Sequence, residues 1–411
     1  MAQAIISRRG GSGSGGGYAA VKFENYGDVQ TVEKGTSTNL VVGRTAPAAT
    51  TVGNYALFGG GRTASSEQTT VDAYSSSLIR VTATSLSKGR FLFDATTVGN
   101  YALFGGGQSD SGGRSYHDVV DAYDGNLARY TPTALSVGRC NLASTTVGNY
   151  AIFGGGMNTT YSISPVDAYS SNLTRSTPTE LSVARSYLTA ATVGEYALFG
   201  GGICSPDIVS TVDAYNKNLT RNTPTGLSVA RGEFTATTVG NYALFGGGAA
   251  SRNYYAIVDA YDGNLTRSTP TVLISARRDL ASTSIGNYAL FGGGYYYDYS
   301  NSSSTYFPTV DCYDSNLTRS VLTGLDVARS HLAATTAGSY ALFGGGTGNG
   351  YNPEVDVYEI ENLVLQATVY KGSKYKFQNM TEEATVTSIA ETISIPTPAT
   401  GYIKFKNTTI S

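Results

Sequence analysis

One stretch of the chain decides the fold: residues 231–277 read RGEFTATTVGNYALFGGGAASRNYYAIVDAYDGNLTRSTPTVLISAR. It contains four short runs rich in β-branched and aromatic residues, namely FTATTV, YALFG, IVDAY and LTRSTPT. Gly-Asn separates the first two runs and Asp-Gly-Asn separates the last two. Because these residues readily take the positive φ angles of tight hairpin turns, the stretch predicts four antiparallel strands, here lettered a to d.

The same unit recurs along the chain. The string GGG begins at Gly59, Gly105, Gly154, Gly200, Gly246, Gly292 and Gly344, at intervals of 46 to 52 residues. Repeats of this length with four strands are typical of propeller blades. A single blade cannot bury both of its faces, whereas blades arranged around an axis cover one another. We therefore expect an all-β protein built on a seven-bladed β-propeller of four-stranded blades.

The N-terminal segment is predicted to close the ring. Residues 28–44 (DVQTVEKGTSTNLVVGR) align without gaps to residues 123–139 (YDGNLARYTPTALSVGR), and Lys34 stands where the repeats carry Arg. The competing segment, residues 362–368, places Leu365 at that position. We expect the N-terminus to supply strand d of the last blade. Pro132, Pro178, Pro224 and Pro270 fall in the predicted strand d, which fits an outer edge strand because proline has no N–H to donate.

The repeat resembles the kelch motif, in which a hydrophobic run ends in a glycine pair, an acidic Val-Tyr strand follows, and a basic residue opens the next unit. The resemblance covers residues 28–358 and implies a propeller. Kelch units usually carry a Trp several residues after the Tyr. This chain has no Trp, and the outer strand offers Leu127, Leu173, Leu219, Leu265 and Leu317 instead.

Four segments are expected along the chain: a Gly/Ser-rich tail (1–17), an N-terminal β segment with the closing strand (18–43), the propeller (44–358) and a C-terminal β module (359–411). The pattern Lys-Phe-x-Asn recurs at Lys22, Lys376 and Lys404. We interpret it as strands from both termini that meet in one small β module.

With 50 Gly, 31 Tyr and only 14% charged residues, the composition favours many short strands and tight turns.

Two faces of the expected disc differ. The a–b and c–d turns form one face, here called the turn face, and they change little between repeats. The b–c loops and d–a connections form the loop face, which ranges from TGNGYNPE (347–354) to YYYDYSNSSSTYFPT (295–309). A constant face opposite a diversified face indicates a binding platform, since recognition residues concentrate on loops carried by a rigid scaffold. Unconstrained drift of the loops would give the same pattern.

Tyrosine is concentrated on the loop face, where a phenol ring suits a sugar or a protein surface. These residues are Tyr116, Tyr161, Tyr254, Tyr255, Tyr295, Tyr296, Tyr297, Tyr299 and Tyr306. The residues just after each repeat Arg should surround the mouth of the central channel. They are Phe91, Asn141, Tyr187, Glu233, Arg278, Asp279 and His331. Glu233, Asp279 and Asp94 also raise the alternative of glycoside hydrolysis by paired carboxylates.

The repeated charges have a structural interpretation. One Arg and one Asp recur in every blade, whereas a catalytic group is needed once, so we expect them to pair within the sheets. They are Arg44, Arg90, Arg139, Arg185, Arg231, Arg277 and Arg329, with Asp72, Asp121, Asp167, Asp213, Asp259, Asp311 and Asp356. Two histidines and three scattered cysteines predict neither a metal site nor a disulfide framework, and we expect no cofactor.

These observations predict a non-enzymatic binding and display protein, a subunit of a virion or phage-tail-like particle that recognises a cell-surface glycan or protein. The terminal segments would contact other subunits of the particle, and the chain could form a homo-oligomer. A net charge of −2 gives no footprint for nucleic acid, and no run of apolar residues is long enough to insert into a membrane. The sequence shows no secretory signal, so we expect release by lysis. Two alternatives remain: a cytoplasmic kelch-like interaction scaffold and a glycan-active enzyme.

Overall fold

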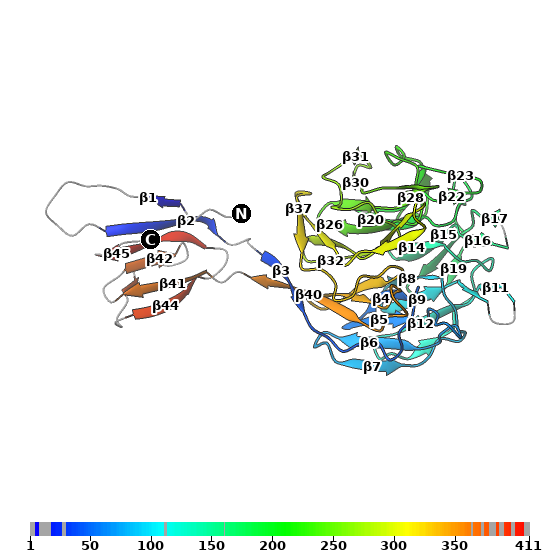
Figure 1. Ribbon diagram of the computed structural model, residues 1–411, viewed down its shortest axis with the longest axis horizontal. Helices are drawn as coiled ribbons and strands as arrows, with labels where there is room; N and C mark the ends of the chain where they lie inside the picture. The colour runs from blue at the N-terminus through cyan, green and yellow to red at the C-terminus, as the bar shows by residue number, and fades with distance from the viewer. Residues whose placement is uncertain are drawn as a thin grey trace. The chain divides into compact units, whose positions relative to one another are not determined.

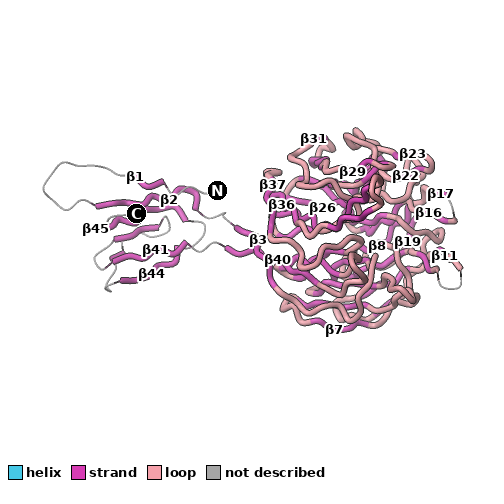
Figure 2. The backbone as a smooth tube through the Cα atoms, in the orientation of Figure 1, coloured by secondary structure: helices cyan, strands magenta, loops and turns pink. Residues whose placement is uncertain are grey.

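The computed structural model describes residues 5–7, 18–26, 30–110, 113–159, 161–362, 365–370, 374–377, 384–385, 390–395 and 399–406. These residues form strands joined by turns and loops, and none of them lies in a helix (Figure 2). They divide into two units. The first combines Met1–Val32 with Ile360–Ser411, and the second is Glu33–Glu359.

The second unit contains seven four-stranded antiparallel sheets, as the repeat predicts. Blade 1 comprises β4 (Ala48–Val52), β5 (Tyr55–Gly59), β6 (Val71–Ser75) and β7 (Arg80–Ala83); blade 2 comprises β8 (Asp94–Val98), β9 (Tyr101–Gly105), β12 (Val120–Tyr123) and β13 (Arg129–Tyr130); blade 3 comprises β14 (Ala143–Val147), β15 (Tyr150–Gly154), β18 (Val166–Ser170) and β19 (Arg175–Ser176). Blade 4 comprises β20 (Thr189–Val193), β21 (Tyr196–Gly200), β24 (Val212–Asn216) and β25 (Arg221–Asn222); blade 5 comprises β26 (Thr235–Val239), β27 (Tyr242–Gly246), β30 (Val258–Asp262) and β31 (Arg267–Ser268); blade 6 comprises β32 (Ala281–Ile285), β33 (Tyr288–Gly292), β36 (Val310–Asp314) and β37 (Arg319–Leu322). Blade 7 comprises β38 (Ala333–Ala337), β39 (Tyr340–Gly344), β40 (Val355–Asn362) and β3 (Gln30–Gly35).

The triple glycine has a separate physical reason at each position, as blade 4 illustrates. A Cβ added to Gly200 would lie 3.0 Å from the Phe245 ring of the next blade, so the first glycine makes room for inter-blade packing. Gly201 and Gly202 have φ angles of +56° and +113°, which side-chain-bearing residues adopt at a cost. Added Cβ atoms there would also lie 2.6 and 2.7 Å from the carbonyl oxygens of Arg231 and Ser186. Glycine is therefore required at these three positions by close packing and, at the second and third, also by positive φ.

The repeated Arg and Asp pair inside each blade, as expected. In blade 5, Arg231 Nη2 lies 2.7 Å from Asp259 Oδ2 and donates to the carbonyl of Phe245 at 3.1 Å. Both charged side chains are fully buried. A second arginine, Arg267 on the outer strand, places its Nη1 3.1 Å from Asp259 Oδ1. The equivalent buried pairs are Arg44–Asp72, Arg90–Asp121, Arg139–Asp167, Arg185–Asp213, Arg277–Asp311 and Arg329–Asp356.

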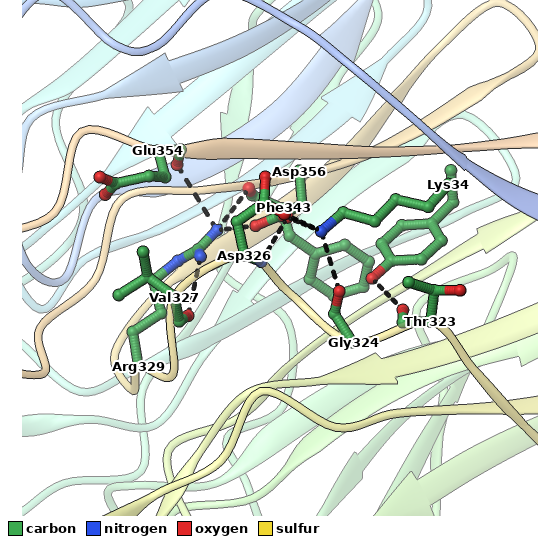
Figure 3. Close-up of polar contacts among 10 residues, drawn as sticks. Lys34, Thr323, Gly324, Asp326, Val327, Arg329, Phe343, Glu354 and Asp356 are labelled. Atoms are coloured by element: carbon green, nitrogen blue, oxygen red, sulfur yellow. Dashed lines mark hydrogen bonds and ion pairs between the residues drawn. The ribbon is translucent and has the colours of Figure 1, made fainter.

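The N-terminal strand closes the ring, which confirms the alignment. The order of blade 7 is β3-β40-β39-β38, and Figure 1 shows β3, in blue, beside β40, in orange. Lys34 occupies the place of the outer-strand Arg: its Nζ lies 2.7 Å from Asp356 Oδ1 and donates to Gly324 O at 2.9 Å (Figure 3). The competing segment belongs elsewhere, because β41 (Leu365–Tyr370) pairs with β44 (Ala390–Ile395).

The prolines end the outer strands instead of lying within them, which corrects the predicted extent of strand d. β13 stops at Tyr130, and Pro132 follows two residues later in the connection. Proline removes a backbone donor, so pairing with the neighbouring strand β12 cannot continue through it. Blade 6 has Leu322 at the equivalent position, and its outer strand β37 extends to four residues.

Strands from both termini share a sheet in the first unit, which confirms the expected terminal β module. The order is β1 (Ile5–Ser7), β2 (Tyr18–Tyr26), β45 (Ala399–Lys406), β42 (Lys374–Phe377) and β43 (Ala384–Thr385). Lys22 in β2 and Lys376 in β42 both pair with Tyr402 in β45, so the Lys-Phe segments occupy adjacent strands. Apart from residues 5–7, the Gly/Ser-rich tail lies outside the described residues.

Candidate functional site

The constancy of the turn face has a structural cause. The a–b turns of blades 1 to 5 and of blade 7 lie against the c–d turn of the next blade: a Cβ added to Gly194 would be 3.5 Å from the Cα of Gly263, and one on Gly99 would be 3.0 Å from Ser171 Cβ. Both glycines also have φ near +54°. Close packing and positive φ therefore restrict the residues that these turns can carry.

The loop face carries small hairpins in blades 2 to 6. They are β10 (Gln108–Ser109) with β11 (Ser115–Tyr116), β16 (Met157–Asn158) with β17 (Tyr161–Ser162), β22 (Ile203–Cys204) with β23 (Asp207–Ile208), β28 (Ala249–Ala250) with β29 (Asn253–Tyr254), and β34 (Tyr295–Asp298) with β35 (Ser303–Tyr306). In blades 1 and 7, single bridges between Arg62 and Glu67 and between Thr347 and Tyr351 stand in their place.

A ring of backbone hydrogen bonds surrounds the channel mouth. The second residue after each repeat Arg has a left-handed backbone, with φ between 48° and 59° in every blade. Six of these residues donate their N–H to the carbonyl of the equivalent residue one blade earlier; Glu233 N, for example, donates to Tyr187 O at 3.1 Å. The ring residues are Ala46, Leu92, Asn141, Tyr187, Glu233, Asp279 and His331. Since the backbone carries the structural role, the side chains are free to differ.

These side chains line a depression of about 230 Å³, here called the mouth. All seven ring residues contribute to it, together with Asp94 just inside the channel. The structure therefore brings together Asn141, Tyr187, Glu233, Asp279 and His331 as expected. Phe91 is a correction: it precedes the ring position by one residue, is 4% exposed, and gives way to Leu92 at the mouth.

Arg278 organises the charged side of the mouth. Its guanidinium forms an ion pair with Glu233, lies 3.5 Å from Asp279 Oδ2, and donates from Nε to Tyr295 Oη at 2.8 Å. His331 Nε2 also lies 3.5 Å from Asp279 Oδ2, and the His331 ring stacks on the Tyr295 ring with centroids 6.1 Å apart. Four predicted residues from blades 5, 6 and 7 thus form one contact network around Arg278.

The network sets the protonation of its members. Burial and the neighbouring Asp279 carboxylate raise the pKa of Glu233 above its ordinary value, and Arg278 opposes this rise. Burial disfavours the charged form of Arg278, yet the carboxylates of Glu233 and Asp279 hold its pKa above the usual range. Burial raises the pKa of Tyr295 to about 12, so its hydroxyl stays protonated at neutral pH. The network therefore offers a neutral phenol beside one guanidinium and two carboxyl groups.

The tyrosines of blades 5 and 6 extend this network onto the hairpins. The Arg278 guanidinium lies 5.6 Å from the Tyr254 ring, which in turn packs on Tyr296 with centroids 4.7 Å apart. Tyr297 and Tyr299 form an edge-to-face pair at 4.9 Å. Tyr296 and Tyr299 remain 37% and 43% exposed, so their rings are accessible from the loop face.

Three predicted tyrosines are not among these ring contacts: Tyr116, Tyr161 and Tyr255. Tyr161, in β17 of the blade 3 hairpin, is 72% exposed. Tyr116, on the blade 2 hairpin, donates its hydroxyl to the carbonyl of Thr159 at 2.6 Å and so links two neighbouring hairpins. Tyr255 follows the blade 5 hairpin, and its carbonyl accepts from Arg277 N at 3.3 Å.

Sequence reasoning missed a second depression, of about 300 Å³, beside the mouth. It is lined by Thr45, Ala46, Arg62, Phe91, Leu92, His331, Thr347 and Tyr351. Its residues come from blades 7, 1 and 2, and none stands out by type within its own repeat. The one available signal was position, because Thr45 and Ala46 directly follow the repeat residue Arg44.

Within the described residues, no three His, Cys, Asp or Glu side chains are grouped so as to hold a metal ion. Asp94 is the one carboxylate at its position in strand a, where the other blades have Ala or Thr. Its carboxylate accepts from Ser144 N at 2.6 Å and Ala95 N at 2.9 Å. Burial in the channel raises the pKa of Asp94 to about 6.

No family model matches the sequence, and no curated protein matches it. A solved structure titled "Structure of YjhT" is similar in fold, with a TM-score of 0.51. The similarity covers 79% of this chain and 99% of that chain, at 10% sequence identity. At this identity the likeness concerns the fold alone. The chain contains a seven-bladed β-propeller, as the seven four-stranded sheets and this likeness show.

Proposed function

We propose that this protein is a non-enzymatic binding and display protein that recognises a cell-surface glycan or protein through its loop face. The observation that supports this most directly is the mouth ring, where one backbone geometry presents seven side chains of five different chemical kinds. A purely structural position would favour one residue type, as the buried Arg–Asp pairs do. Diversity on a constant frame is the arrangement that recognition requires.

Assembly into a virion or tail-like particle is the second part of the proposal. The repeats are nearly identical, as in recently duplicated modules, and strands from both termini form a unit separate from the propeller. That unit would attach the chain to other subunits. Kelch-like ancestry agrees with the repeat pattern but not with the absence of Trp.

Binding of the purified protein to whole cells and to a glycan array tests the first part. The informative variant is Tyr296→Ala with Tyr299→Ala, because both rings are exposed on the loop face. Tyr130→Ala is the matched control, since Tyr130 is 43% exposed on an outer strand, the same fraction as Tyr299. We expect saturable binding that the double variant weakens about tenfold or more and the control retains.

Absence of binding by the folded wild-type protein would refute the recognition proposal. The same incubations with glycans test hydrolysis by the mouth carboxylates when newly released reducing ends are measured. Release of reducing ends would favour a glycan-active enzyme over a display protein. Electron microscopy of lysates with antibody against the chain tests particle association. Uniform soluble labelling would favour the intracellular scaffold.

A further inference from the structure

The two depressions of the loop face are neighbours. The mouth and the second depression share Ala46, Leu92 and His331 as lining residues. Ala46 and Leu92 contribute short apolar side chains to this shared boundary, and His331 is 34% exposed there. The second depression, here called the lateral pocket, therefore continues the mouth outward between blades 7, 1 and 2.

The lateral pocket presents flat surfaces. The Arg62 guanidinium lies over the Phe91 ring, 4.8 Å from its centroid, and covers that ring, which is 4% exposed. Arg62 also pairs with Asp110 at 3.2 Å, so its charge is balanced. Tyr351, 36% exposed, supplies an aromatic ring on the blade 7 side. Two planar groups with adjacent threonine hydroxyls suit the apolar face and the hydroxyl groups of a sugar ring.

The backbone around the pocket is already paired. Thr45 and Arg62 exchange both of their N–H···O=C bonds, at 3.0 and 2.9 Å, and Ser330 and Thr347 do the same at 2.8 Å. Ala46 N donates to His331 O at 2.8 Å. A peptide that binds by strand addition needs free main-chain groups at a strand edge, and Thr45, Arg62, Ser330 and Thr347 offer none in these bridges. Recognition at these bridges would therefore use side chains, and the planar groups and hydroxyls of the pocket suit a glycan.

Charge narrows the class of glycan. Three carboxylates, Asp94, Glu233 and Asp279, line the mouth against the single guanidinium of Arg278. An acidic sugar would be repelled there, and the balanced Arg62–Asp110 pair does not compensate in the lateral pocket.

We propose that the loop face binds a linear neutral oligosaccharide of at least two sugar units, one in the mouth and the next in the lateral pocket between Arg62 and Tyr351. This inference rests on the proposed recognition function and specifies its ligand. Two linked sites engage one chain, so affinity should rise with chain length until both are filled.

The test uses full-length protein and sets of linear neutral oligosaccharides, of one to six units, built from glucose, mannose, xylose and N-acetylglucosamine. Titrations compare wild type with Tyr351→Ala, Tyr351→Phe and the control Tyr130→Ala, each checked by circular dichroism and melting temperature. For at least one series we expect affinity to rise about tenfold or more beyond the single sugar. Tyr351→Ala should remove that gain and leave single-sugar affinity within about twofold, and Tyr351→Phe should retain the gain because the ring remains.

Length-independent affinity, or equal losses by Tyr351→Ala on single sugars and oligosaccharides, would overturn the two-site ligand. Saturable binding to cells without binding to any neutral series would overturn the inference and leave the recognition function intact. Absence of binding to both cells and sugars would overturn both.

Discussion

Closure of the ring by Lys34 can be tested by Lys34→Met, which keeps the aliphatic stem and removes the ammonium group. The Lys34 side chain is 13% exposed, and its Nζ lies 2.7 Å from Asp356 Oδ1. Burial opposes its charge, but the carboxylates of Asp326 and Asp356 raise the pKa of Lys34, so the ammonium is present at neutral pH. A hydrogen bond to a charged group contributes about 1.5–3 kcal/mol to stability.

The expected loss in the free energy of unfolding is therefore about 2 kcal/mol. It should not be larger, because Asp356 keeps its buried partner Arg329 at 2.7 Å. Asp326, at 74% exposure, adds little. Arg129→Met is the matched control in blade 2: Arg129 is 27% exposed and contacts Asp121 at 3.1 Å, so we expect a loss of about 1 kcal/mol.

Urea denaturation at pH 7 measures both losses, and hydrogen exchange locates them. Lys34→Met should speed amide exchange in β40, which borders the closing strand, whereas Arg129→Met should act on β12. A Lys34→Met protein within 0.5 kcal/mol of wild type, or a costlier Arg129→Met, would refute the assignment of closure to this side chain.

Three further predictions concern the scaffold. Arg185→Met should lower the free energy of unfolding by about 3–5 kcal/mol, because it leaves the buried Asp213 with only the weaker partner Arg221. The double variant Arg185→Met with Asp213→Leu should recover part of this loss; urea titrations in which the losses of the two single variants simply add would contradict this. The pKa of Asp94 in the folded protein is about 6, above its unfolded value, so ionisation of Asp94 should lower the stability of the wild type as the pH rises from 4 to 6. Asp94→Asn should therefore be more stable than the wild type by about 1–2 kcal/mol at pH 7 and equally stable at pH 4, which thermal melts at both pH values measure. Gly200→Ala should cost about 1–3 kcal/mol because its Cβ would lie 3.0 Å from the Phe245 ring, and an unchanged denaturation midpoint would exclude this contact.

The experiments on the loop face depend on the turn face staying intact, which makes the choice of variants important. Tyr296 lies in strand β34 of the blade 6 hairpin, Tyr299 lies in the turn of that hairpin, and Tyr351 lies in the b–c loop of blade 7. None of the three belongs to the Arg–Asp pairs or to the mouth ring. By contrast, Arg278 contacts Glu233, Asp279 and Tyr295, so changing it would alter several contacts at once. This is why the proposals are tested through the tyrosines.

The sequence by itself determined the propeller, its number of blades, the closing strand and the buried ion pairs. Each of these follows from a signal repeated in every blade, or from one alignment such as Lys34 against Arg129. A repeated local pattern reports local structure reliably, because every copy must satisfy the same hydrogen bonds and packing. The exact ends of the outer strands were not predicted: β13 stops at Tyr130, before Pro132, whose missing N–H prevents pairing from continuing through it.

Only the tertiary structure decided which side chains meet on the loop face. Arg278 contacts Glu233, and Asp279 contacts His331, so this network spans three blades. The lateral pocket brings Arg62 and Tyr351 together from opposite ends of the propeller sequence. The ring position falls on Leu92 and not Phe91 because of a left-handed backbone that hydrogen bonds between blades hold in place. Contacts of this kind depend on distances between blades, which no periodicity within one repeat encodes.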